Sequence, residues 1–136
     1  MAYFEWADDM VIDEGAIDND HKKLVNLVNE LHDATSVGKG HEVIEKIMTD
    51  LIAYTKEHLQ HEEQIMAAIH FPNLERHKLG HKQFAEKLNT LQRQFEAGSI
   101  IVASQLSTVL RDWLSLHIRR SDKEIKDFLQ KNRMKI

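Results

Sequence analysis

Long stretches of this chain contain neither proline nor glycine. Its 136 residues include one proline, Pro72, and only five glycines. These two residue types interrupt helices most strongly, and the alternation typical of strands is nowhere sustained. The breaks at Gly38–Gly40, at Pro72 and around Gly98 therefore leave four segments with helical periodicity. We predict helices over residues 18–37, 41–69, 73–96 and 102–130.

Each predicted helix carries an apolar stripe along one face. In the third, Phe84, Leu88 and Leu91 recur at steps of four and three, the period of a helix that packs against a core. Short connections favour antiparallel neighbours. The sequence thus predicts an all-α fold, an up-down-up-down antiparallel four-helix bundle in one domain over residues 1–136. Residues 1–17 are too apolar for a loose tail, so we expect them to pack along the bundle as an arm.

The composition excludes several classes of protein. Cysteine is absent, which rules out disulfides, thiolate metal sites and cysteine nucleophiles. The net charge of -4 is spread along the chain, and nothing suggests nucleic-acid binding. The N-terminus lacks the basic start and apolar run of a signal peptide, and no apolar stretch approaches the roughly 20 residues that span a membrane. We expect a cytoplasmic protein without a membrane or nucleic-acid partner.

Histidine is the unusual residue, with nine in the chain, and several lie on the apolar stripes. His21 heads the stripe of the first predicted helix. Residues four apart share a helix face, which groups His58 with Glu62 and His77 with His81. Buried ionisable groups are costly unless they are paired or bind a metal. A bundle core holding five histidines and two carboxylates would be very unstable without an ion.

His117 and Asp122 form a further pair with a different spacing. Five residues on a regular α-helix separate two side chains by about 140°. A single π-helical turn would bring both to one face, and such turns are common at functional sites. We therefore predict a π-turn between His117 and Asp122.

Taken in order, these residues resemble the ligand pattern of the hemerythrin family. Short flanking stretches match as well, among them Phe71-Pro72 and Trp113-Leu114 before His117, and the resemblance runs from about Trp6 to Lys126. Leu59 and Ile125 depart from residues common in the family, which affects the expected shape of the pocket. The matching positions are His21, His58-x-x-x-Glu62, His77-x-x-x-His81 and His117-x-x-x-x-Asp122.

The resemblance implies a di-iron centre. One iron would be bound by His77, His81 and His117, and the other by His21 and His58. Glu62, Asp122 and an oxo or hydroxo group from solvent would bridge the two irons. Counted against two six-coordinate irons, this set leaves one position open, on the iron with two histidines. There dioxygen would bind end-on and become a hydroperoxide.

The donor set is consistent with iron on chemical grounds. Zinc prefers four ligands and calcium a nearly all-oxygen shell, whereas imidazoles with bridging carboxylates suit iron. Leu114 and Ile118 flank His117 and are candidates for the apolar wall of the oxygen pocket, although core packing explains both equally well. The remaining ionisable residues near these positions are expected to be non-ligands: His32, His41, His61, Glu63 and His70.

Three functions are compatible with such a centre. The leading interpretation is a protein that is not an enzyme and reversibly binds dioxygen, as a carrier, store or delivery protein. The first alternative is a di-iron oxidase, or an enzyme that handles peroxide or nitric oxide. The second is an oxygen or redox sensor. Five neutral imidazoles against two carboxylates favour binding over oxidation, because di-iron oxidases are richer in carboxylates. A protein partner that receives oxygen or a signal is left unidentified.

Overall fold

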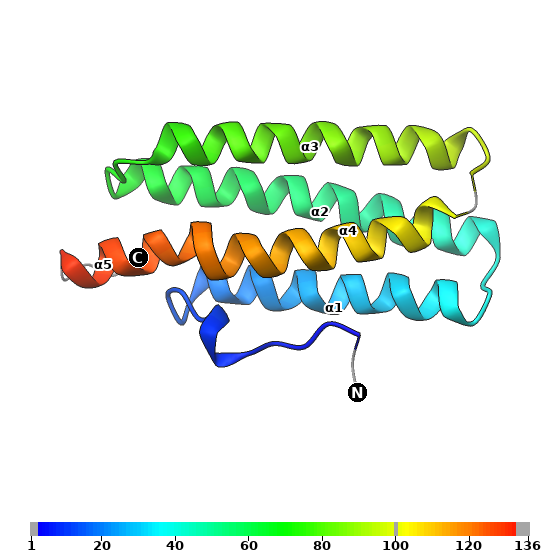
Figure 1. Ribbon diagram of the computed structural model, residues 1–136, viewed down its shortest axis with the longest axis horizontal. Helices are drawn as coiled ribbons and strands as arrows, with labels where there is room; N and C mark the ends of the chain where they lie inside the picture. Colours follow the sequence, from blue (N-terminus) through cyan, green and yellow to red (C-terminus); the bar gives the residue numbers. More distant parts are fainter. Residues whose placement is uncertain (1–2, 100, 133–136) are drawn as a thin grey trace.

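A computed structural model describes residues 3–99 and 101–132 of the chain. Four long helices lie side by side and alternate in direction, as the course of the ribbon in Figure 1 shows. They are α1 (Ala16–Ser36), α2 (His41–Ala68), α3 (Leu74–Glu96) and α4 (Val102–Leu116). Each helix packs against the next, and α4 packs back against α1. The predicted up-down-up-down four-helix bundle is confirmed.

The fourth predicted segment consists of three consecutive pieces. After α4 the chain forms the π-helical turn η2 (His117–Asp122) and then continues as α5 (Lys123–Lys131). The prediction of a π-turn at these residues is confirmed. In Figure 1, α5 extends the line of α4 beyond the end of the bundle.

The first helix begins two residues before its predicted start. The Asp13 carboxylate accepts hydrogen bonds from the backbone N–H groups of Ile17 and Asp18, at 3.0 and 3.1 Å. These groups belong to the first turn, whose N–H donors have no partner within the helix. The two extra residues are stabilised from outside the helix, so periodicity within the segment could not reveal them.

The N-terminal arm packs along the bundle, as predicted, over the described residues 3–15; residues 1–2 of the predicted arm lie outside them. A short 3₁₀ turn, η1 (Asp8–Met10), interrupts it. Two hydrogen bonds join the backbone of Phe4 to the side chain of Asn29 in α1. The Asn29 amide nitrogen donates to the Phe4 carbonyl at 2.8 Å, and the Phe4 N–H donates to the Asn29 amide oxygen at 2.7 Å. Met10 and Ile12 are buried. The arm is thus part of the core.

The interior of the bundle is apolar in its middle and contains ionisable side chains toward one end. Its middle is apolar, with Leu51, Leu88, Leu106 and Leu110 fully buried. The buried ionisable side chains gather toward the end where α2 turns into α3. None of the described helices has an apolar stretch long enough to cross a membrane.

Candidate metal centre

Three of the long helices, together with the π-turn that follows α4, contribute to one cluster of buried polar side chains. The donors come from the N-terminal parts of α1 and α3, from the second half of α2 and from η2, which all meet at one end of the bundle in Figure 1. Each of these side chains belongs to a residue with at most 9% of its surface exposed. The cluster comprises His21, His58, Glu62, His77, His81, His117 and Asp122.

The carboxylate of Glu62 lies between two pairs of imidazoles. Its Oε2 is 2.8 Å from Nε2 of His21 and 2.6 Å from Nε2 of His58. Its Oε1 is 3.5 Å from Nε2 of both His81 and His117. Each oxygen of one carboxylate therefore faces a different pair of nitrogens, the arrangement needed to bridge two ions.

Asp122 repeats this two-sided arrangement. Its Oδ2 lies 3.1 Å from His21 Nε2, and its Oδ1 lies 3.0 Å from His117 Nε2. The π-turn makes this possible, because it brings His117 and Asp122 to the same face despite their spacing of five. Most of these donor atoms are about 3 Å apart, which is the spacing of neighbouring ligands around one ion at about 2.1 Å.

Two groups of donors could each hold a metal ion, and they share Glu62. One contains His21, His58, Glu62 and Asp122, and the other contains Glu62, His81 and His117. The division separates His21 and His58 from His81 and His117, while Asp122 belongs to the first group alone.

His77 is the one predicted ligand without a nitrogen in either group. It is buried, but its Nε2 lies 3.2 Å from Oε2 of Glu124, which also accepts hydrogen bonds from Arg76. Its Nδ1 is buried without a partner. The role of His77 as an iron ligand stays a prediction.

Atoms without hydrogen-bond partners indicate what the cluster could hold. Buried side-chain polar atoms are nearly always hydrogen-bonded, so each exception needs a cause. Among the described residues, every such exception belongs to a predicted ligand, and a cation between the carboxylates would satisfy His58 Nε2 and the oxygens of Glu62 and Asp122. The atoms are His21 Nδ1, His58 Nε2, Glu62 Oε1, His77 Nδ1 and both Asp122 oxygens. Imidazole nitrogens with carboxylate oxygens fit a pair of iron ions.

Carboxylates outside the cluster hold the far nitrogens of two histidines. Asp20 Oδ2 lies 3.1 Å from His58 Nδ1, and Glu63 Oε2 lies 2.9 Å from His81 Nδ1. A carboxylate there accepts a hydrogen bond from Nδ1–H and leaves Nε2 free to bind a metal. Glu63, expected to be a non-ligand, contacts His81 from a partly exposed position. His61, half-exposed, also contacts Asp20 Oδ2 at 2.6 Å.

Sequence reasoning assigned no role to Asp20. The only available signal was its position directly before His21, since its contact with His58 joins residues 38 apart in the chain. The hydrogen bond from His58 holds the pKa of Asp20 well below its usual range despite partial burial, and His61 adds to this effect. Asp20 is therefore a permanent anion beside the cluster.

Without a metal, protons balance the two buried carboxylates. Burial alone would lower the pKa of His21, but its hydrogen bonds with Asp122 and Glu62 outweigh burial and raise the pKa to about 10. Burial opposes protonation of His117 as well, yet the charge of Asp122 raises the pKa of His117 to about 10. Burial works against ionisation of Glu62, but the charge of His58 holds the Glu62 pKa well below its usual range.

Aromatic and aliphatic side chains fix the position of His117. The Trp113 ring stacks on the imidazole, with a centroid separation of 4.2 Å and an interplanar angle of 13°. Phe84 stacks on Trp113 in turn, at 3.8 Å. Leu114 and Ile118, on either side of His117 in sequence, are buried.

Comparisons with known proteins agree with this geometry. Residues 14–129 match the family model described as the hemerythrin HHE cation binding domain. The chain is 35% identical to a bacteriohemerythrin of Pseudomonas aeruginosa, over 90% of this chain and 78% of that protein. It is 30% identical to myohemerythrin-1 of Phascolopsis gouldii, over 88% of each. A crystal structure of wild-type hemerythrin superposes with a TM-score of 0.82 at 30% identity, covering 93% of this chain and 97% of that one.

Replacing Asp20 by alanine should weaken metal binding. The His58 Nδ1 proton would lose its acceptor, and removal of such outer partners typically costs 10- to 100-fold in metal affinity. Competition with a chromogenic chelator for ferrous iron, under anaerobic conditions, measures the change. Asp50→Ala removes an exposed carboxylate from α2 and serves as the control. Equal affinities of the two variants would contradict the role of Asp20.

Loading the metal-free protein at pH 8 should release protons. His21 and His117, with pKa values of about 10, are protonated at that pH, whereas ordinary imidazoles are not. A metal needs the nitrogen lone pair, so binding displaces about one proton from each. This release should decline as the pH rises through about 10. Calorimetric titration in buffers with different ionisation enthalpies counts the protons, and a heat independent of buffer at pH 8 would refute the assignment.

Proposed function

Because this chain belongs to the hemerythrin family, whose non-heme di-iron domains typically bind oxygen, we propose that it binds dioxygen reversibly as a carrier, store or delivery protein. One observation carries the proposal: Glu62 and Asp122 each direct one oxygen toward His21 and the other toward His117. Two carboxylates in this position can bridge two ions while imidazoles complete each shell. A centre for a single ion has no need of both bridges.

The proposed ligands are those expected from the sequence. His77, His81 and His117 would hold one iron, and His21 and His58 the other. Glu62, Asp122 and a solvent-derived oxo or hydroxo group would bridge them. When bound, the two irons supply the electrons that dioxygen accepts as it binds and that return when it leaves.

The protein side chains would keep this chemistry reversible. Asp20 and Glu63 hold the Nδ1 protons of His58 and His81, which fixes the orientation of both imidazoles. Leu114 and Ile118 have 1% and 0% of their surface exposed, and they lie one turn before His117 and directly after it. We propose that they form the apolar wall that keeps water and protons from the oxygen site.

An enzymatic role has less support. Proteins of the hemerythrin family are oxygen-binding carriers rather than enzymes. The excess of neutral imidazoles over carboxylates supports the same choice, because carboxylate-rich sets are typical of di-iron oxidases.

A sensor remains the second candidate because of one contact. Arg119 lies within the π-turn and donates a hydrogen bond from Nε to Asp9 of the arm, at 2.8 Å. A change of ligand or oxidation state at His117 or Asp122 could therefore reach the arm through η2. A difference in the rate of proteolysis within the arm between reduced and oxygen-exposed protein would favour this second function.

The visible spectrum of the iron-loaded protein tests the proposal. The protein is reduced without oxygen, exposed to air and then flushed with argon. We expect an absorption band that appears with oxygen and disappears under argon. A ferric spectrum that forms at once and never reverses would contradict reversible binding, and the absence of any iron band would contradict the metal centre itself.

Replacing Leu114 by alanine should speed irreversible oxidation of the iron-loaded protein in air, because the smaller side chain admits water beside the centre. Leu106→Ala is the matched control. It removes an equally buried leucine from α4, about 16 Å from His117 along the helix, and should cost a similar amount, about 2–5 kcal/mol, in unfolding free energy. Oxidation is followed by absorbance and stability by urea denaturation. The same oxidation rate in both variants would contradict the proposal that Leu114 lines the oxygen pocket.

A further inference from the structure

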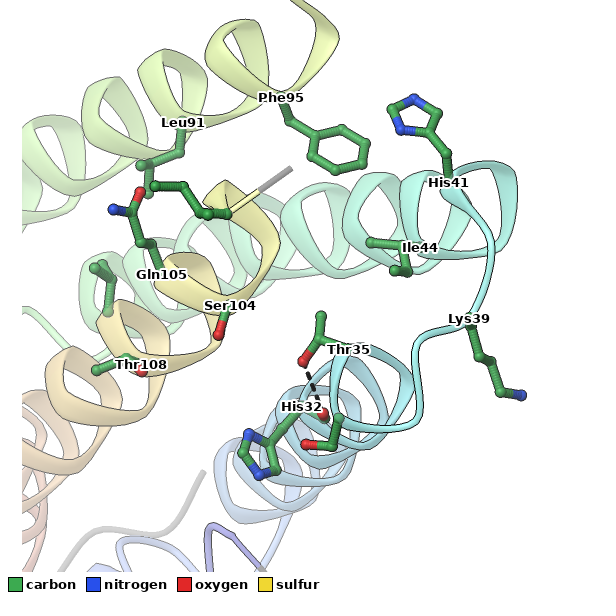
Figure 2. A pocket seen from close by; sticks show the side chains of 13 residues that line it. His32, Thr35, Lys39, His41, Ile44, Leu91, Phe95, Ser104, Gln105 and Thr108 are labelled. Carbon is green, nitrogen blue, oxygen red and sulfur yellow. Dashed lines mark hydrogen bonds between the residues drawn. The ribbon is translucent and has the colours of Figure 1, made fainter. Parts of the chain in front are cut away.

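The far end of the bundle contains a large open cavity. It has a volume of about 950 Å³, at the upper end of the range of small-molecule pockets, and residues from all four long helices line it. Figure 2 shows these side chains around the opening between the α1–α2 loop and the start of α4. The cavity is remote from the metal centre, because His32 follows His21 by eleven residues, a rise of about 16 Å along α1.

The two sides of this cavity differ in chemistry. Leu91 and Phe95 of α3, Ile101 just before α4 and Val109 of α4 supply most of the apolar surface, and α4 also contributes Ser104, Gln105 and Thr108. The opposite side, from α1 and the loop after it, presents hydrogen-bonding groups: His32, Thr35, Ser36 and Lys39. A ligand that matched both sides would have one apolar part and one polar part.

The imidazoles beside the cavity are held by aromatic neighbours. His41 stacks on Phe95 with a centroid distance of 4.6 Å and an interplanar angle of 4°. His32 stacks on Tyr3 of the arm, at 3.7 Å and 10°. Both rings are thus fixed at the edge of the opening instead of collapsing into it.

Apolar surface is concentrated at the same end. Of the five large hydrophobic residues that are exposed among those described, three lie in the loops or first turns there: Val37, Val43 and Ile101. Ile101 lines the cavity itself with 62% of its surface exposed. Exposed apolar patches of this kind typically mark binding sites.

The charge of the lining favours an anion. None of the thirteen described lining residues is acidic, and they include Lys39 and two histidines. The chain as a whole has a net charge of -4, so this absence of carboxylates is local. One carboxylate, Glu45, faces His41 from outside the lining, at 3.4 Å.

We propose that this cavity binds a free amphipathic monocarboxylate with an unbranched apolar chain. Its chain would lie on Leu91, Phe95 and Val109, and its carboxylate would lie on the side of the opening from which Lys39 extends (Figure 2). The proposal does not depend on the di-iron centre, because the two sites share no residue.

Calorimetric titration of the full-length, iron-loaded protein with decanoate tests this site. We expect saturable binding of one decanoate per chain. Each methylene buried contributes about 0.8 kcal/mol, so octanoate, shorter by two methylenes, should bind about fifteenfold more weakly. No saturable binding, or affinities independent of chain length, would overturn the proposal. Binding only to vesicles of anionic lipid would overturn it in favour of a membrane surface.

Two pairs of exposed variants locate the ligand. Lys39→Glu should weaken decanoate binding about three- to tenfold and leave decanol binding unchanged, because an exposed ion pair contributes up to about 1 kcal/mol. Lys46→Glu, on α2 outside the lining, should change neither the decanoate affinity nor the decanol affinity. Gln105→Trp fills the opening and should abolish binding of both probes, whereas Gln64→Trp should not.

Iron content of the four variants separates this site from the metal centre. It should equal that of the unmodified protein, whatever the decanoate result. Equal decanoate affinities in Lys39→Glu and Lys46→Glu, and in both tryptophan variants, would show that the cavity is not the binding site. A dimer in ultracentrifugation that dissociates in Gln105→Trp would overturn the proposal in favour of a second copy of the chain.

Discussion

Two carboxylates buried completely among imidazoles impose the main constraint on this structure. An isolated carboxylate is very costly to remove from water, and Glu62 and Asp122 have no exposed surface. Their charge must be balanced by protons on His21 and His117 or by a cation. One end of the bundle therefore depends on its occupant for stability, while the apolar layers around Leu88 and Leu106 hold the helices together independently of it.

A second set of charges surrounds the first. Asp20 and Glu63 accept hydrogen bonds from the outer Nδ1 atoms of buried histidines, and both lie partly exposed at the surface. Each links solvent to the core through a single imidazole ring. The cluster is thus built in layers, with bridging carboxylates inside, imidazoles around them and orienting carboxylates at the boundary with water. Changes at the surface can consequently affect groups that solvent never reaches.

Local periodicity in the sequence predicted most of the fold and much of the candidate site. The four helices and their inward faces are predictable from steps of three and four, and the spacing of His117 and Asp122 predicted the π-turn because only that distortion aligns them. Contacts between side chains of different helices could not be predicted from periodicity. The roles of Asp20 and Glu63 depend on which helices become neighbours and how they are rotated. The cavity at the far end was missed because no pattern encodes a space left unfilled between helix ends.

The π-turn also sets the orientation of the C-terminal helix. One additional residue in a helix rotates the downstream part by about 100° relative to the upstream part. Ile125 and Leu129 of α5 are buried in this rotated frame, and Asp127 and Gln130 are turned toward water. The phase of α5 is therefore set by the same insertion that aligns two metal-facing side chains. Shortening the turn by one residue would misalign the centre and also turn the hydrophobic face of α5 away from the bundle, so neither feature can change without the other.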